Sequence, residues 1–203
     1  EIEPSAMCLE IGDVARAVAD LEAHGGRLDL VFANAGFGVA GAIQNLALTD
    51  YRRQFETNVF GLLRTIYETL ESLRAARGRL VLVGSVAGHV AAPNASAYAA
   101  SKFAVRGLSE AVRGDLATLG IKVTLVSPGF VDSDIRRTDN RGVVHRGVPD
   151  PVPAWLRVPT DVAVREIVRG VDAGRAEIVV TGHGKAIVFF ARHFPRLMRW
   201  FLS

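Results

Sequence analysis

The stretch RLVLVGSVAGHVAAPNASAYAASK, residues 79–102, contains the pattern that decides the fold. It begins with a short, mostly apolar run at residues 79–83, and a polar residue, Ser85, follows soon after. From Ser96 the pattern changes to a longer periodic segment that reaches Thr118. A short apolar strand followed by a longer helix is typical of the repeating unit of a parallel α/β sheet.

The same alternation runs through the whole chain. The runs that we expect to be strands are 5–9, 28–33, 79–83, 121–126 and 177–180. The segments that we expect to be helices are 13–26, 49–77, 96–118 and 160–172, with caps at Asp13, Thr49 and Thr160. Residues 132–158 are rich in Arg, Gly and Pro and predict a long mobile loop that carries function. The sequence therefore predicts an α/β fold with a doubly wound parallel sheet.

Composition fits one globular domain and excludes several classes of protein. The net charge of the 203 residues is only +3, and the basic character comes from scattered arginines, so nucleic acid is not expected as a partner. Cys8 is the single cysteine, and no Cys/His spacing suits zinc, so neither a disulfide within the chain nor a metal site is expected. No signal peptide or spanning apolar run is present, which favours a cytoplasmic location.

Polar residues follow the predicted strands at their carboxyl ends, where ligands bind in open parallel sheets. They are Asn34, Ser85 and the pair Pro128-Gly129. Tyr98 and Lys102 are four residues apart on the helix that follows Ser85, so both side chains project from one face of that helix. A tyrosine beside a cation suits acid–base chemistry, because an ammonium group stabilises the phenolate and lowers a pKa that is ordinarily near 10.

With these elements in order, the sequence resembles the short-chain dehydrogenase/reductase family over essentially its whole length. The fragments that carry the similarity are Asn34-Ala35-Gly36, Asn58 within residues 56–59, Gly84 to Gly88, Tyr98 to Lys102, and Pro128 to Ser133. Ser133 stands where the family usually has Thr, and Glu10 stands where Asp is more frequent near the adenine ring. The resemblance implies a Rossmann-type sheet and an enzyme that interconverts a secondary alcohol and a ketone with NAD or NADP.

The resemblance also implies roles for individual residues. Tyr98 is expected to be the acid/base, Ser85 to hold the substrate oxygen, Lys102 to assist Tyr98 and bind ribose, and Asn58 to relay protons from Lys102 to solvent. The residues expected to bind the cofactor are Glu10, Asn34, Ala35, Gly36, Tyr98, Lys102, Pro128, Gly129, Val131 and Ser133. An apolar substrate is expected from Phe37, Val90, Phe130 and Trp155 around the pocket. The alternatives are a non-catalytic nucleotide-binding sensor on the same fold and a membrane-attached scaffold; the intact Ser85, Tyr98 and Lys102 argue against the sensor.

The family's opening strand, Gly-rich phosphate turn and second strand have no counterpart in this sequence. We therefore expect natural residues upstream of Glu1, an amino-terminally incomplete domain over 1–184, and a cofactor form, NAD or NADP, that the sequence does not reveal. The expected structure is a four-stranded parallel core, with residues 1–12 detached, poorly ordered or unusually paired. We also expect an empty or distorted cofactor site.

The last nineteen residues, 185–203, read KAIVFFARHFPRLMRWFLS and predict a basic amphipathic tail. Arg192, Arg196 and Arg199 fall on one helical stripe, with most of the large apolar residues opposite. Pro195 should kink the helix or start a new one. We interpret the tail as a peripheral membrane contact or as a helix that covers the substrate loop or a partner subunit. Helices 49–77 and 96–118 resemble the pair through which the family forms dimers and tetramers, so a homodimer or homotetramer is expected.

Overall fold

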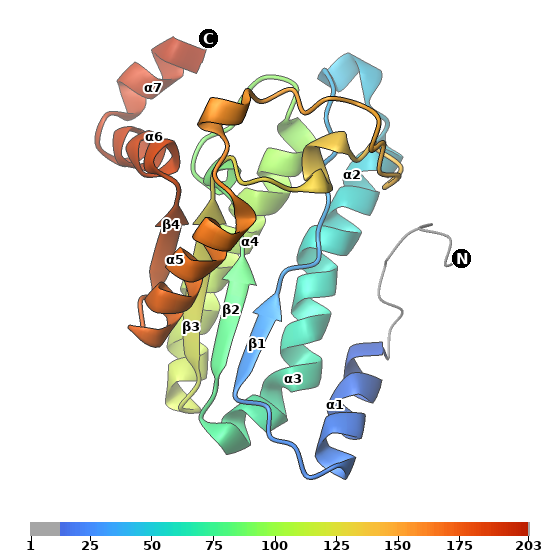
Figure 1. Ribbon diagram of the computed structural model, residues 1–203, viewed down its shortest axis with the longest axis vertical. Coiled ribbons are helices and arrows are strands. Elements are labelled where there is room, and N and C mark those ends of the chain that lie inside the picture. Colours follow the sequence, from blue (N-terminus) through green and yellow to red (C-terminus); the bar gives the residue numbers. More distant parts are fainter. Residues whose placement is uncertain (1–12, 203) are drawn as a thin grey trace.

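The protein, seen in a computed structural model that describes residues 13–202, is a parallel sheet with helices on both faces (Figure 1). The strands are β1 (Leu30–Ala33), β2 (Arg79–Val83), β3 (Lys122–Pro128) and β4 (Glu177–Val180). They lie in the order β1-β2-β3-β4, and every neighbouring pair is parallel. This confirms the predicted four-stranded core and the doubly wound α/β, Rossmann-type fold. The strand expected at 5–9 and the residue Glu10 lie outside the described residues.

Helices connect and cover the strands. The α-helices are α1 (Asp13–Ala23), α2 (Leu48–Phe55), α3 (Leu62–Ala76), α4 (Ser96–Thr118), α5 (Thr160–Asp172), α6 (Gly182–His193) and α7 (Pro195–Leu202). Short 3-10 turns occur at η1 (Ile43–Asn45), η3 (Val86–Gly88), η4 (Asp134–Arg137) and η5 (Ala154–Leu156), and a π-helix, η2, spans Glu56–Gly61. Among these described helices, none is both long enough and apolar enough to cross a membrane.

The two faces of the sheet are buried in two separate clusters. Leu80 and Leu82 of β2 join the cluster beneath α3 and α4, whereas Val81 between them joins the cluster beneath α5. Alternate residues of a strand point to opposite faces, so a continuous apolar run is what a strand covered on both sides requires. Figure 1 shows α5 in front of the sheet and α4 behind it.

Strand bounds differ from the predicted ones because each strand extends only as far as its partner. β1 begins at Leu30, not residue 28, because Leu30 pairs with Arg79, the first residue of β2. The chain just before β2 cannot extend the ladder, since Arg77 ends α3 in a left-handed conformation. β3 runs on to Pro128 because that residue pairs with Val180.

The segment predicted as one helix over 49–77 is divided into three parts. It begins at Leu48, and the Asp50 carboxylate accepts the Ala47 N–H at 2.9 Å, so the expected cap at Thr49 is wrong. Its middle is the π-helix η2, which carries Asn58. A π-helix inserts an extra residue into the helix and is found mostly at functional sites.

The carboxyl-terminal segment forms two helices beside β4. α7 begins at Pro195, so this proline starts a new helix, which was one of the two expectations for it. The expected division between residues 184 and 185 falls inside α6, whose Val188 is buried. α6 therefore belongs to the packed domain, and α7 is the part that extends from it (Figure 1).

Candidate active site

A cavity of about 650 Å³ lies at the carboxyl ends of the strands, where the sequence places the polar residues. The predicted site residues that line it are Asn34, Gly36, Ser85, Tyr98, Lys102, Pro128, Gly129, Val131 and Ser133. The fold thus brings together residues from the ends of β1, β2 and β3 and from α4. The expectation of an empty or distorted cofactor site stays a prediction; the side chains themselves share one cavity.

Ser85 follows β2 and begins the turn η3. Its Oγ accepts the N–H of Ala87 at 3.1 Å, which fixes the hydroxyl at the strand end. The Ser85 side chain also hydrogen-bonds the Tyr98 hydroxyl. Burial raises the pKa of Tyr98 above its ordinary value of 10, while the Ser85 bond and the positive charge of Arg136 act in the opposite direction. Tyr98 is therefore a protonated phenol in direct contact with Ser85.

Lys102 lies one helical turn beyond Tyr98 and is buried. Its Nζ donates to the Val83 carbonyl at 3.0 Å and lies 5.8 Å from the centre of the Tyr98 ring. Burial lowers the pKa of Lys102 from its ordinary 10.5 to about 8. An ammonium group at this position favours the phenolate form of Tyr98, because opposite charges stabilise one another in a poorly solvated site.

Asn58 is buried on the π-helix η2 and does not line the cavity directly. Its amide donates to the Phe37 carbonyl at 3.0 Å and to Ser101 Oγ at 3.1 Å, and its Oδ1 accepts the Phe37 N–H at 3.1 Å. Asn58 thereby holds the backbone directly after Gly36 and contacts α4 one residue before Lys102. The widened helix is what brings its side chain between these two segments.

Gly36 passes so close to this cluster that no other residue fits. A Cβ at this position would lie 2.9 Å from Asn58 Oδ1 and 3.8 Å from Lys102 Nζ. Side-chain atoms do not tolerate approaches below about 3 Å, so the Asn34-Ala35-Gly36 turn depends on the missing Cβ. Ala35 belongs to this turn but does not line the cavity.

Apart from Val131, the apolar wall of the cavity comes from residues that the sequence did not single out. It consists of Phe32, Val83, Val131, Ile135, Ala163, Val164, Ile167 and Val168. The expectation that Phe37, Val90, Phe130 and Trp155 form this wall is wrong, since the cavity-lining residues include none of them. Trp155 is 83% exposed. Helix α5 packs across the sheet face and supplies four of the wall residues, a contact between segments far apart in sequence.

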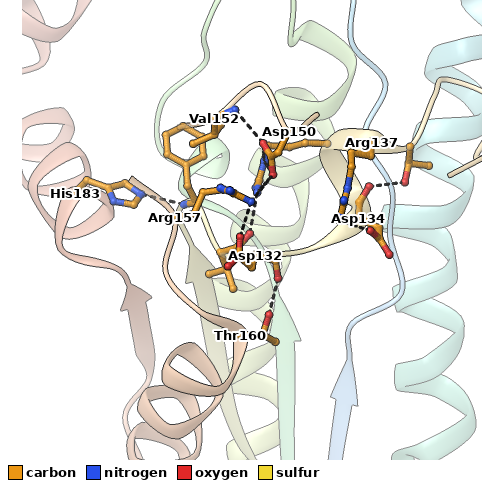
Figure 2. A network of polar contacts seen from close by, with 12 residues as sticks. Asp132, Asp134, Arg137, Asp150, Val152, Arg157, Thr160 and His183 are labelled. Carbon is orange, nitrogen blue, oxygen red and sulfur yellow. Dashed lines mark hydrogen bonds and ion pairs between the residues drawn. The ribbon is translucent and has the colours of Figure 1, made fainter. Parts of the chain in front are cut away.

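Residues 132–158 are irregular, as predicted, but they are tethered and not a free loop (Figure 2). Arg136 forms a bidentate pair with Asp150, with Nε–Oδ1 at 2.8 Å and Nη2–Oδ2 at 2.6 Å. Arg157 pairs with Asp132 at 2.8 Å. Arg136 also keeps the pKa of Asp150 well below its usual range, so the pair is ionised at neutral pH.

Two further contacts join this loop to the rest of the site. The Asn140 side chain exchanges two hydrogen bonds with the backbone of Ala40, both at 2.9 Å. Thr160 Oγ1 donates to the Asp132 carbonyl at 2.6 Å, so this side chain secures the loop and does not cap α5 as expected. Asp132 and Arg136 line the cavity, and the network therefore fixes one of its walls.

Two residues near the site were missed at the sequence level. Gln54 is fully buried, and its side chain bonds the backbone of Val39 at 2.6 Å and of Phe37 at 2.8 Å. Its spacing, four residues before Asn58, was the signal that could have found it. His183 follows the end of β4 and accepts the Phe130 N–H at 2.9 Å; the strand-end rule that selected Ser85 would have selected it too.

No metal site is evident in the part of the chain that the structure describes. No group of three His, Cys, Asp or Glu side chains among residues 13–202 is arranged to hold an ion. The polar groups that line the cavity include the Tyr98 hydroxyl, the Ser85 hydroxyl and the Lys102 ammonium.

Comparisons with known proteins identify the family and the fold. A family model described as short chain dehydrogenase matches residues 9–143. The chain is 37% identical to 3-ketodihydrosphingosine reductase of Bacteroides thetaiotaomicron over 131 residues, which are 64% of this chain and 48% of the relative. It is 29% identical to dehydrogenase/reductase SDR family member 7B of Xenopus laevis over 198 residues, which are 94% of this chain and 60% of the relative.

A similar fold is seen in a crystal structure of a short chain dehydrogenase from Burkholderia cenocepacia in complex with NADP. The TM-score is 0.78 at 23% sequence identity, over 100% of this chain and 76% of that chain. The chain spans about half of the length of the Bacteroides relative and three fifths of the Xenopus one.

Proposed function

Because this chain belongs to the short-chain dehydrogenase family, we propose that it carries the catalytic centre of an oxidoreductase that interconverts a secondary alcohol and a ketone with NAD or NADP. The observation that supports this most directly is the placement of Ser85, Tyr98 and Lys102. The Tyr98 hydroxyl is hydrogen-bonded to Ser85, and the Lys102 ammonium lies 5.8 Å from the Tyr98 ring.

The residues present fit the nicotinamide end of a dinucleotide. Gly36 and Gly129 both line the cavity, and at each position a Cβ would collide with neighbouring side-chain atoms of the protein. Backbone without a side chain therefore faces the cavity on two sides. Lys102 offers an ammonium group to ribose hydroxyls between them. The Burkholderia cenocepacia structure holds NADP, and we extend the cofactor class to this chain. When bound, such a dinucleotide supplies or accepts a hydride.

Each proposed catalytic group then acts on the substrate oxygen or on its proton. Tyr98 Oη transfers a proton to that oxygen in ketone reduction and removes it in alcohol oxidation. Ser85 Oγ donates a hydrogen bond to the same oxygen and stabilises the negative charge that develops there. Lys102 favours the phenolate that Tyr98 becomes after it has given up its proton.

Asn58 completes the proposed proton path. It contacts Ser101, the residue before Lys102, and holds the backbone of Phe37, the residue after Gly36. We assign Asn58 the role of linking Lys102 to solvent through the opened turn of η2. The π-helix supports this assignment because it frees backbone groups from ordinary α-helical bonding at the position of Asn58.

The proposed substrate is a ketone or alcohol with an apolar body. Seven aliphatic side chains and Phe32 line the cavity beside the reactive groups, and burial against them favours apolar carbon over polar groups. The Bacteroides relative is named as a reductase of a 3-keto compound, which is the functional group that we propose here.

We further propose that α7 contacts a membrane surface peripherally. Its apolar side chains are open to solvent, with Trp200 76% and Phe201 77% exposed, and exposed Arg196 lies on the same helix. Aromatic and cationic side chains on one short helix suit an anionic interface. Such a contact would bring the cavity near apolar substrates.

We also propose a homodimer or homotetramer assembled through η2, α3 and α4. Phe60, Tyr67 and Phe103 on these helices are 49%, 71% and 42% exposed. Exposed aromatics on neighbouring helices are typical of protein interfaces.

The experiment that tests the proposed reaction is a turnover assay of the protein at its full natural length. Aliphatic ketones and secondary alcohols of increasing chain length are combined with NADH, NADPH and their oxidised forms, and absorbance at the nicotinamide band is followed. Turnover that increases with chain length is expected. Dinucleotide binding without turnover on any substrate would instead favour the nucleotide sensor.

A further inference from the structure

The end of β4 meets the segment that follows β3 at one wall of the cavity. Pro128 pairs with Val180 in the sheet, and the Gly129 N–H donates to the Val180 carbonyl at 3.2 Å. Pro128 and Gly129 both line the cavity. The position of this wall therefore depends on how the chain beyond β3 is held against the chain beyond β4.

His183, in the first turn of α6, makes the next contact along this wall. Its Nε2 accepts the Phe130 N–H at 2.9 Å, and its ring stacks on the Phe130 ring with centroids 5.1 Å apart and planes 25° from parallel. Figure 2 shows His183 directed toward the loop from the side of β4. A backbone N–H can only donate, so Nε2 carries no proton and the neutral imidazole has its hydrogen on Nδ1. Burial lowers the pKa of His183 and so favours this neutral form.

Thr181 contacts the His183 imidazole. Its Oγ1 accepts the Gly184 N–H at 3.1 Å and lies 3.1 Å from His183 Nε2. Its backbone has φ +82°, a conformation that β-branched residues rarely adopt. Such strain persists where surrounding contacts hold the residue in place, and it is common at functional sites.

Gly129 allows the two segments to approach. A Cβ on Gly129 would lie 2.4 Å from Thr181 Oγ1 and 2.6 Å from His183 Nε2. The Gly129 backbone is therefore in direct contact with the Thr181–His183 pair. Pro128 has no N–H, so the backbone donors of residues 128–130 are the N–H groups of Gly129 and Phe130. The first donates to Val180, the last residue of β4, and the second donates to His183, which follows β4.

We propose that His183 is a positioning residue, which accepts the Phe130 N–H and so fixes the Pro128–Gly129 wall at the distance that the dinucleotide requires. This inference rests on the proposed function for the identity of the ligand. The contact itself is a property of the chain alone. His183 acts through the backbone and touches neither substrate nor the reacting atoms.

Two substitutions separate the acceptor from the ring. His183→Phe keeps a flat ring that can stack on Phe130 but has no acceptor. His183→Gln has no ring but offers a carbonyl oxygen to the Phe130 N–H. The matched control is His193→Phe, because His193 lies at the other end of α6 and also stacks on a phenylalanine, Phe189, at 4.4 Å, far along the helix from the cavity wall.

The first measurement is hydrogen exchange of the Phe130 amide in the protein at its full natural length without dinucleotide. Exchange should accelerate roughly tenfold in His183→Phe, which corresponds to the loss of one hydrogen bond, and return to within about threefold of the unsubstituted rate in His183→Gln. His193→Phe should leave it unchanged. Equal exchange in all forms would overturn the proposal. If His183→Phe does not fold, His183→Leu takes its place, since it also lacks an acceptor.

The second measurement is dinucleotide affinity and steady-state kinetics on the same proteins. The KM and Kd for dinucleotide should rise roughly tenfold in His183→Phe while kcat changes much less, and His183→Gln should restore both constants. Failure of the Gln variant to restore affinity would refute the acceptor role. An unsubstituted protein that binds no dinucleotide refutes the proposed function instead, and the exchange result then still decides whether His183 holds the wall.

Discussion

The Lys102 ammonium donates a hydrogen bond of 3.0 Å to the carbonyl oxygen of Val83, the last residue of β2. This contact joins α4 to the end of the strand. Ser85 lies two residues beyond Val83, and Tyr98 lies one turn before Lys102, so the contact links the two segments that carry the two hydroxyls. The buried Lys102 ammonium thus has a backbone carbonyl as its partner in place of solvent, next to the groups that we propose as catalytic.

Tyr98→Phe should abolish most of the turnover. The substitution keeps the ring and removes the proton that the reaction needs, so kcat should fall by at least roughly a hundredfold, the size of a general acid–base contribution. Dinucleotide affinity should stay within about twofold. Tyr67→Phe on the exposed face of α3 is the control, and it should leave kcat unchanged. Near-normal turnover of Tyr98→Phe would show that another group moves the proton.

Lys102→Met should remove turnover and stabilise the fold. The pKa of Lys102 is about 8 in the folded state and near 10.5 in the unfolded state. Between these two pH values the unfolded chain binds more protons than the folded one. The free energy of unfolding therefore rises as pH rises through this range. Below pH 8 the folded state bears the full cost of burying the charged ammonium, roughly 3 kcal/mol. Methionine at position 102 removes that cost but loses the hydrogen bond to Val83, which contributes about 1 kcal/mol.

The unfolding free energy of Lys102→Met at pH 7 should therefore increase by roughly 2 kcal/mol in urea titrations. Between pH 7 and about 9.5 the stability of the unsubstituted protein should rise relative to that of the variant. Lys122→Met, at the exposed start of β3, should show neither effect. A less stable Lys102→Met with the ordinary pH dependence would contradict the burial cost.

His89→Gln should remove part of the sensitivity of the fold to acid. His89 is buried, its Nε2 lies 3.0 Å from Ser127 Oγ, and burial lowers its pKa from 6.5 to about 4. The stability that this neutral imidazole contributes is complete above pH 6.5 and is lost as pH falls toward 4, by roughly 3 kcal/mol in total. Glutamine has a similar reach and does not titrate. Urea titrations at pH 7, 5.5 and 4.5 measure the difference, with exposed His24→Gln as control; parallel curves for all three proteins would exclude His89 as the source.

Phe103→Glu should break the proposed dimer or tetramer into monomers. Phe103 is 42% exposed on α4, and a carboxylate at the centre of an apolar interface is left desolvated and unpaired. Light scattering at micromolar concentration measures the mass. Trp155→Glu, which introduces the same charge at the most exposed large side chain, should leave assembly intact. A monomer before any substitution would disprove the interface.

Trp200→Ser combined with Phe201→Ser should abolish binding to anionic liposomes. Both rings are more than three quarters exposed, and Leu197 on the same helix is half exposed. Co-sedimentation with vesicles of phosphatidylserine and phosphatidylcholine measures binding, and turnover on a water-soluble ketone should not change. Loss of stability or turnover, with no vesicle binding in the unsubstituted protein, would mean that α7 covers the loop or a partner subunit.

Much of the fold could be predicted because the informative signals are local. Apolar runs bounded by glycines identified four of the strands that the structure contains, and α4 and α5 were predicted with their observed bounds. The strand ends were less predictable, since β1 begins where β2 begins, and that depends on pairing across the sheet. The apolar spacing of 49–77 predicted one continuous helix and did not reveal the π-helix that carries Asn58.

The candidate site divides in the same way. Ser85, Tyr98 and Lys102 lie within one strand–helix unit, so their spacing in sequence reports their spacing in the structure. The apolar wall was predicted wrongly because Val164 and Val168 reach the cavity from α5, across the sheet from the strand ends. The Arg136–Asp150 pair gave no signal in the sequence, since its two charges are brought together only by folding, whereas His183 could have been found from its place after β4.

The strand order β1-β2-β3-β4 matters for synthesis as well as for packing. Within residues 30–180 each new strand pairs with the strand that was synthesised just before it. The partner of each new strand in this range is therefore already present when that strand leaves the ribosome. The sheet can grow one strand–helix unit at a time as the chain emerges, at roughly 5–20 residues per second. The Tyr98 and Lys102 pair is complete at the second addition, whereas the wall formed by Gly129, Thr181 and His183 closes only after the fourth strand has been made. Assembly of the chemical groups thus precedes assembly of the surface that orients the ligand, and an interrupted translation product would have the first without the second.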